Sequence, residues 1–154
     1  MVVAAISVLI ATLFLPILQI SGDSMSPSFT DGQIVVLFKS PSFKRGDVVG
    51  FYYQGKILLK RVIAEPGDTV VIDGDGNVYV NTQLLEENYV EEKSLGDSDV
   101  EYPYVVPEQS YFVLGDKRSN SVDSRSSVIG SIPKDQIIGR IFFRVWPFDK
   151  IDLI

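Results

Sequence analysis

The first twenty residues of this chain carry no charged side chain, and nearly all of them are apolar. As a helix, residues 2–20 would be about 28 Å long, close to the roughly 30 Å hydrocarbon thickness of a bilayer. Pro16 is tolerable there because it lies near the end of the stretch. The sequence therefore predicts a transmembrane anchor over residues 1–20. A cleaved signal peptide and a buried core helix are the alternatives.

Residues 21–154 differ in composition: short runs rich in Val, Ile, Phe and Tyr are separated by turns that contain Gly and Asp. Such runs are typical of β-strands. The expected strands are 33–37, 47–53, 57–64, 69–72, 78–80, 111–114 and 137–145. No long helical periodicity appears here, so we expect a mainly β domain, an antiparallel sheet or barrel-like structure, over residues 21–154.

One stretch of this domain breaks the pattern of strands. Residues 86–108 are acidic and contain few aliphatic side chains. We interpret them as a surface excursion or small flap, within an inserted β/loop extension over residues 74–108. Asp73–Asn77 resembles the start of a calcium loop, but Val78 and Leu84 stand where that loop needs Gly and Glu. A hairpin turn explains this stretch better.

The chain contains no histidine and no cysteine, and its formal net charge is -6. The common zinc sites, thiolate chemistry and disulfides are therefore excluded, and we expect no metal or cofactor. The negative net charge argues against a nucleic-acid partner. A serine nucleophile normally needs a nearby base, which in this chain must be Lys, Asp or Glu.

Ser24 is the candidate nucleophile. It lies in Ser21-Gly-Asp-Ser-Met-Ser-Pro27, shortly after the apolar stretch. Small residues beside a proline suit an exposed hydroxyl on a tight backbone, whose N–H group could stabilise an oxyanion. A plain turn is the alternative for this segment.

Lys60 is the candidate base, within the strand expected at 57–64. Alternation along a strand places Lys60 on one face with Leu58 and Val62, and sends Arg61 to the opposite face. Aliphatic neighbours would desolvate the ammonium and lower the pKa of Lys60 toward neutrality. A surface lysine with a partly buried stem is the alternative.

A third polar segment, residues 115–125, directly follows the apolar strand expected at 111–114. Two arginines, two aspartates and several hydroxyls in so short a run favour a hydrogen-bonded network. Asp123 and Arg125 could pair, and Ser121 could offer its hydroxyl to a neighbouring amine. A solvated turn is the alternative.

Together these blocks resemble the bacterial type I signal peptidases, which are membrane-bound Ser/Lys endopeptidases. The shared blocks are Gly-Asp-Ser-Met-x-Pro at 22–27, Lys-Arg-Gly-Asp-Val-Val at 44–49, the run from Lys60 to Asp68, and Gly-Asp-x-Arg-x-Asn-Ser-x-Asp-Ser-Arg at 115–125. The resemblance implies that Ser24 is the nucleophile and Lys60 the general base. It also implies that Ser121 orients the lysine, and that Asp123 and Arg125 form a supporting ion pair with Asp116 nearby.

The resemblance implies an oxyanion donor at the Ser24 backbone N–H. Some members have a second donor on a serine two residues earlier, where this chain has Gly22, which leaves that donor uncertain. Ile20, Leu58 and Leu59 are the implied walls of shallow pockets that select small residues before the cut. Lys117 and Ser119 depart from the Asn and Asp that family members often carry there.

The implied function is removal of signal peptides from secretory pre-proteins at the cell membrane. The chain would cross the bilayer once, contact lipid, lie near the secretion translocon, and hold its catalytic domain on the periplasmic or extracellular side. The alternative is a non-catalytic relative that assists assembly of surface pili, which would lack the Ser or the Lys. A cytosolic self-cleaving regulator is a third option, but it would carry a DNA-binding module in place of the anchor.

Overall fold

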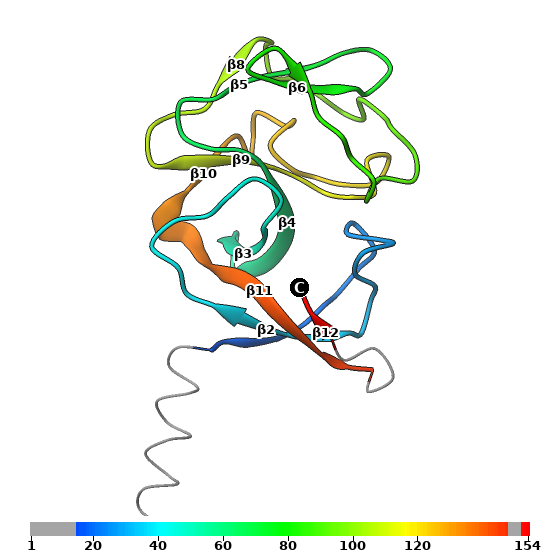
Figure 1. The fold of residues 1–154 in the computed structure, drawn as a ribbon, viewed down its shortest axis with the longest axis vertical. Helices are drawn as coiled ribbons and strands as arrows, with labels where there is room; N and C mark the ends of the chain where they lie inside the picture. The colour runs from blue at the N-terminus through cyan, green and yellow to red at the C-terminus, as the bar shows by residue number, and fades with distance from the viewer. Residues whose placement is uncertain (1–14, 148–151) are drawn as a thin grey trace, which may run out of the picture.

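Two antiparallel β-sheets make up the computed structural model, which describes residues 15–147 and 152–154 (Figure 1). The large sheet contains β1 (Ile17–Gln19), β2 (Ile34–Phe38), β3 (Val48–Tyr53), β4 (Lys56–Ala64), β9 (Ser110–Leu114), β10 (Ile132–Pro133), β11 (Ile137–Trp146) and β12 (Asp152–Leu153). The small sheet contains β5 (Thr69–Ile72), β6 (Val78–Val80), β7 (Gln83–Leu84) and β8 (Tyr104–Val105). A single 3-10 turn, η1 (Lys134–Gln136), is the helical element of this part of the chain.

The strand order of the large sheet is β1-β2-β11-β3-β4-β9-β10, with β12 paired to β11, and that of the small sheet is β7-β6-β5-β8. The prediction of a mainly β, antiparallel domain is confirmed. Each of the seven expected strands matches an observed one to within a residue at either end: β2, β3, β4, β5, β6, β9 and β11. The five strands that were not expected have two or three residues each, and alternation is hard to recognise over so short a run; β6 is equally short but was expected.

The predicted membrane anchor over residues 1–20 needs correction at its end. Residues 1–14 lie outside the described residues, but Ile17–Gln19 form β1 and pair with β2 rather than continuing a helix. Within residues 15–147 and 152–154, no helix has the length and apolarity needed to span a bilayer. The backbone of residues 17–19 is extended because β2 supplies hydrogen-bonding partners along this edge of the sheet.

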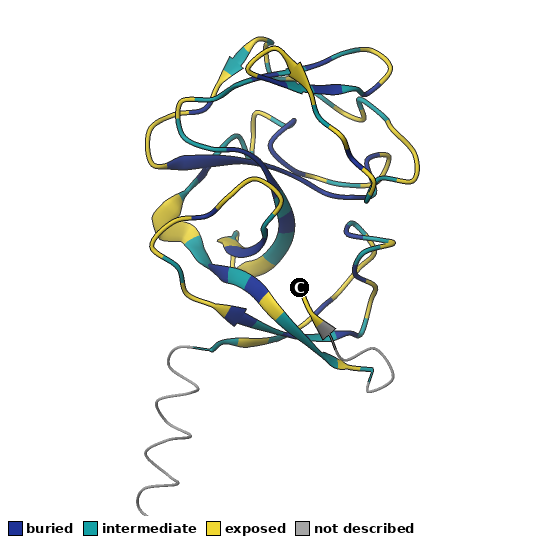
Figure 2. Cartoon of the chain, viewed as in Figure 1, coloured by how far each residue is buried: buried dark blue, intermediate teal, exposed yellow. Residues whose placement is uncertain are grey.

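The two sheets share a core that surrounds β9. Every residue of β9 is buried, because its two faces contact different clusters (Figure 2). Tyr111 and Val113 pack with residues of β3 and β4, whereas Phe112 and Leu114 pack against the small sheet. The small sheet therefore covers one face of β9 and of the last residues of β4, and both strands lead directly into polar segments.

The acidic segment 86–108 is only partly the surface excursion that its composition predicted. Glu87 and Val106 are buried, and Tyr102 and Tyr104 pack against the core shared by the two sheets. The segment also adds β8 to the small sheet, next to β5. Asp73 does begin the expected hairpin turn, since its Oδ1 accepts hydrogen bonds from the N–H groups of Asp75 and Asn77.

Candidate active site

The structure brings Ser24 and Lys60 into direct contact. The Lys60 Nζ lies 2.7 Å from the Ser24 Oγ, within hydrogen-bonding distance. Lys60 is in the middle of β4 and only 3% exposed, as its aliphatic neighbours predicted. Ser24 lies in the turn between β1 and β2 and is partly exposed.

Packing of the residue after the serine holds this turn in place. The Met25 side chain is buried in a cluster with Val35, Leu37 and Val48 of the large sheet. The N–H of Phe29 donates to the carbonyl of Met25, and that of Ser26 donates to the carbonyl of Asp23. The Ser24 side chain is therefore presented at the surface by a turn whose neighbouring residue is anchored in the core.

The pKa of Lys60 is lowered from its ordinary value, chiefly because burial disfavours the charged ammonium. Asp123 opposes this shift, Arg125 adds to it, and Asp116 opposes it. Burial prevails, so the structure favours a neutral amine more than water would. A neutral amine at hydrogen-bonding distance from a hydroxyl is able to accept its proton.

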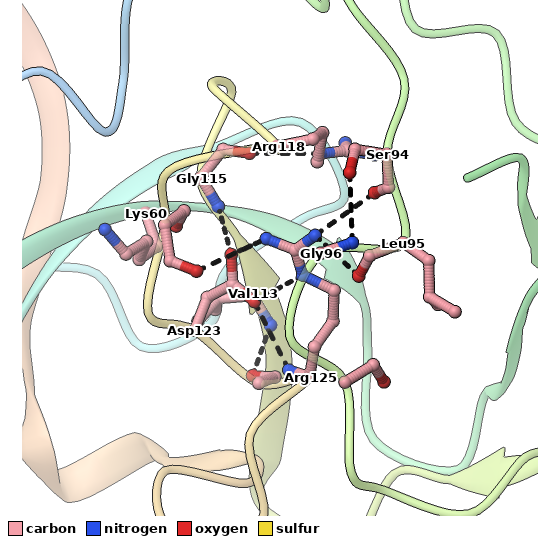
Figure 3. Close-up of polar contacts among 12 residues, drawn as sticks. Lys60, Ser94, Leu95, Gly96, Val113, Gly115, Arg118, Asp123 and Arg125 are labelled. Atoms are coloured by element: carbon pink, nitrogen blue, oxygen red, sulfur yellow. Dashed lines mark hydrogen bonds and ion pairs between the residues drawn. The ribbon is translucent and has the colours of Figure 1, made fainter. Parts of the chain in front are cut away.

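Asp123 and Arg125 form a buried ion pair beside this site (Figure 3). The Arg125 Nε donates to Asp123 Oδ1 at 2.8 Å, and the Arg125 Nη2 donates to Oδ2 at 2.9 Å. The same Oδ2 accepts a hydrogen bond from the N–H of Gly115 at 3.0 Å. The pair predicted from the sequence is thus present, and it also fixes the backbone at the start of the polar segment 115–125.

Ser121 lies near Ser24 and makes no hydrogen bond to the lysine. Its hydroxyl is buried and has no hydrogen-bond partner among the described residues. A Cβ placed on Gly115 would collide with the Ser121 side chain and lie 2.7 Å from the carbonyl oxygen of Ser24. Gly115 therefore lies between these two serines, where a larger residue would not fit.

Asp116 binds an arginine rather than the lysine. Arg61 donates from Nε to Asp116 Oδ1 at 2.8 Å and from Nη2 to Oδ2 at 2.6 Å. Arg61 follows Lys60 in β4 and points to the opposite face, as alternation requires, where its guanidinium lies 4.1 Å from the ring centroid of Tyr89. The sequence placed Arg61 on that face but gave no signal for its contacts with Asp116 and Tyr89.

Gly22 offers no side chain to an oxyanion, and its backbone N–H donates to Asp31 Oδ1 at 2.7 Å. Its φ of +90° is a conformation that glycine adopts without strain. The second oxyanion donor is therefore not identified at this position, and the backbone N–H of Ser24 stays the predicted donor.

A cleft of about 600 Å³ opens beside Ser24 and Lys60. Its walls come from β1, the following turn and β4, and include the three residues expected there, Ile20, Leu58 and Leu59. Leu18 and Ile57 also line it and were not expected from the sequence. Ser24 and Lys60 are themselves among the residues that line the cleft.

The sequence did not predict several other polar contacts around the site. Lys117 and Asn120 both bind the carboxylate of Asp23, the residue before the nucleophile. Arg118 binds Glu87 from the acidic segment, and both side chains are almost fully buried. The sequence showed many charges in residues 115–125 but gave no signal for their partners.

Comparison with known proteins identifies the family. Residues 1–146 match the family model described as signal peptidase, peptidase S26. The chain belongs to this peptidase family. It is 37% identical over 157 residues to the signal peptidase I of Bacillus licheniformis, an alignment that covers 92% of this chain and 81% of that protein.

Two further relatives agree with this membership of the signal peptidase family. The probable signal peptidase I-2 of Synechocystis is 42% identical over 97 residues, covering 62% of this chain and 41% of that protein. A crystal structure of a signal peptidase I from Enterococcus faecalis V583 is 29% identical and matches with a TM-score of 0.53. That match covers 66% of this chain and 98% of the other. The resemblance stated from the sequence blocks is thus confirmed.

Proposed function

We propose that this member of the signal peptidase family is a serine endopeptidase that cleaves signal peptides with Ser24 as nucleophile and Lys60 as general base. The observation that carries the proposal is the 2.7 Å contact between the Lys60 Nζ and the Ser24 Oγ in a site where burial lowers the pKa of the lysine. No histidine is present in the chain to serve as the base.

The proposed reaction has two steps. Neutral Lys60 takes the Ser24 proton as the Oγ attacks the carbonyl carbon of the scissile bond. Protonated Lys60 then gives this proton to the leaving amine, which becomes the new N-terminus, and an acyl-enzyme is left. Lys60 next takes a proton from water, whose oxygen attacks the ester, and returns it to Ser24 as the signal peptide is released as a free acid.

The surroundings give the remaining roles. The Ser24 N–H is the proposed oxyanion donor, with the second donor unassigned at Gly22. Asp123 and Arg125 keep the polar segment 115–125 in place beside the lysine. The buried Ser121 hydroxyl, which has no hydrogen-bond partner among the described residues, is the group proposed to orient the lysine. Ile20, Leu58 and Leu59 line the cleft for the small residues that precede the cut, with the substrate extended along β4.

A membrane anchor in the apolar N-terminal stretch before β1 is part of the proposal, and residues 1–14 of that stretch lie outside the described residues. The catalytic domain then lies at the outer face of the membrane, close to lipid and to the translocon that delivers pre-proteins. A serine a few residues beyond the anchor meets a signal peptide where it leaves the bilayer. The pilus-assembly alternative is not favoured, because both Ser24 and Lys60 are present.

The test is cleavage of a pre-protein by the full chain in detergent or lipid, with N-terminal sequencing of the product. Ser24→Ala and Lys60→Ala should each lower kcat by at least about a thousandfold, because neither half of the pair works alone. Lys134→Ala is the matched control, since Lys134 is exposed and does not line the cleft. Cleavage at the wild-type rate by either active-site variant would contradict the proposal.

A further inference from the structure

A buried ion pair joins the acidic segment 86–108 to the polar segment beside the active site. The Arg118 Nη1 donates to Glu87 Oε2 at 3.2 Å, and its Nη2 binds Oε1, so the pair is bidentate. The side chains are 1% and 0% exposed, respectively. A buried carboxylate–guanidinium pair is costly to desolvate and does not by itself indicate a gain in stability. Its position suggests another role.

Arg118 connects this pair to the backbone at the active site. Its Nε donates to the carbonyl of Gly115 at 3.0 Å, while the N–H of Gly115 donates to Asp123. Both polar backbone groups of Gly115 are therefore held by buried charged side chains. Gly115 lies against the Ser121 hydroxyl and the Ser24 carbonyl, so its position sets the space between these two residues.

The acidic segment makes a second attachment to the same polar segment. The Arg125 Nη1 donates to the carbonyls of Ser94 and Leu95 at 3.2 and 2.9 Å (Figure 3). A Cβ on Gly96 would lie 2.6 Å from that Nη1, so the backbone approaches Arg125 as closely as it can. Two arginines of the polar segment are thus tied to one stretch, residues 87–96.

We propose that Glu87 is a positioning residue for the Ser24–Lys60 site and acts through Arg118 and the carbonyl of Gly115. The inference rests on the proposed function. The acidic segment 86–108 then holds the polar segment 115–125 in position next to the active site. Glu87 does not line the cleft, whose walls come from residues 18–25 and 55–60, so its effect falls on the chemical step and not on substrate binding.

The experiment compares Glu87→Gln, Glu87→Asp and the control Glu86→Gln in the full chain. Glu86 is the exposed sequence neighbour of Glu87 and carries the same charge. At a temperature at which melting curves show every variant folded, Glu87→Gln should lower kcat by about ten- to a hundredfold with KM unchanged, because small displacements of reacting groups are costly. Glu87→Asp keeps the charge but is one methylene shorter, and should give an intermediate kcat.

Hydrogen exchange at the Gly115 amide supplies a readout that does not depend on activity. Exchange should be faster in Glu87→Gln than in the wild type, and unchanged in Glu86→Gln, because Arg118, which holds the Gly115 carbonyl, loses its charged partner and is less firmly placed. If the wild type cleaves no pre-protein, the proposed function fails while exchange still tests Glu87.

A folded Glu87→Gln variant with wild-type kcat, or with wild-type exchange at Gly115, would overturn the inference. A rise in KM at unchanged kcat would do the same. If Glu87→Gln does not fold, Glu87→Asp takes its place, with lowered kcat and faster exchange as the supporting result and wild-type values as the opposing one.

Discussion

The chemistry of this chain depends on one lysine whose neighbours are apolar on its own strand face and ionic just beyond it. Burial lowers the pKa of Lys60, and the opposing effects of Asp123 and Asp116 are smaller. Leu58 and Val62 flank it in the sequence, which made the burial predictable. The effects of Asp123 and Arg125 on the pKa of Lys60 were not predictable, because those residues come near the lysine only in the folded chain.

The pH dependence of cleavage follows from this shift. Only the neutral amine can accept the Ser24 proton. We therefore expect kcat/KM to reach its full value above the lowered pKa of Lys60 and to fall as the pH drops through that pKa. The acid limb should have unit slope and a midpoint below the 10.5 of an unperturbed lysine. The measurement is kcat/KM against pH with a pre-protein substrate. A rate that rises toward acid pH would contradict the role given to Lys60.

The same shift predicts a stability effect. Between the lowered native pKa and the value of 10.5 in the unfolded chain, the unfolded state binds the extra proton, so wild-type stability should rise with pH in that window. Lys60→Met, which keeps length and removes charge, should raise the melting temperature at neutral pH, and this gain should shrink as pH approaches 10.5. Melting curves across neutral to alkaline pH test this, and a gain independent of pH would contradict it.

At the scale of elements, the strand β4 pairs with β3 over residues 56–61 and with β9 over residues 61–64. Its length of nine residues, its β-branched content and its turn signals made it predictable from sequence. β1 was not predicted, because three apolar residues at the end of an apolar stretch fit a helix equally well. Residues 17–19 are a strand because they pair with β2.

Close approach of strands leads to a prediction at Gly139 of β11. A Cβ there would lie 2.6 Å from the carbonyl oxygen of Phe38, a backbone atom that cannot easily move. Gly139→Ala should therefore lower the free energy of unfolding by about 1–3 kcal/mol. Gly74→Ala is the matched control, since a Cβ on Gly74 meets nothing within 4 Å. Urea unfolding midpoints make the comparison, and equal midpoints for the two variants would count against it.

At the scale of the whole molecule, the two sheets share one core at β9, so the small sheet should not unfold alone. Phe112 is fully buried in that shared core with residues of β5 and β6. Phe112→Ala should lower the free energy of unfolding by about 3–5 kcal/mol and weaken both sheets together. Val105→Ala, at an exposed position of β8, should change it by less than about 0.5 kcal/mol.

Two probes can show whether both sheets lose stability together in Phe112→Ala. Trp146, the one tryptophan of the chain, lies in β11 and reports on the large sheet. Amide exchange at Val70 and Val80 reports on the small sheet. Both should give the same unfolding free energy in Phe112→Ala. Loss of protection in the small sheet at an unchanged Trp146 signal would show that the sheets unfold separately.

The sequence by itself determined the seven expected strands, the absence of a histidine base, and the polar blocks that resemble a signal peptidase. These features are local, because strand faces and turns are set by neighbouring residues. Only the tertiary structure decided that Ser24 meets Lys60 at 2.7 Å, that Asp116 binds Arg61, and that Glu87 binds Arg118. Ion pairs between residues 31 to 55 positions apart follow from how the two sheets pack, and no local pattern specifies them.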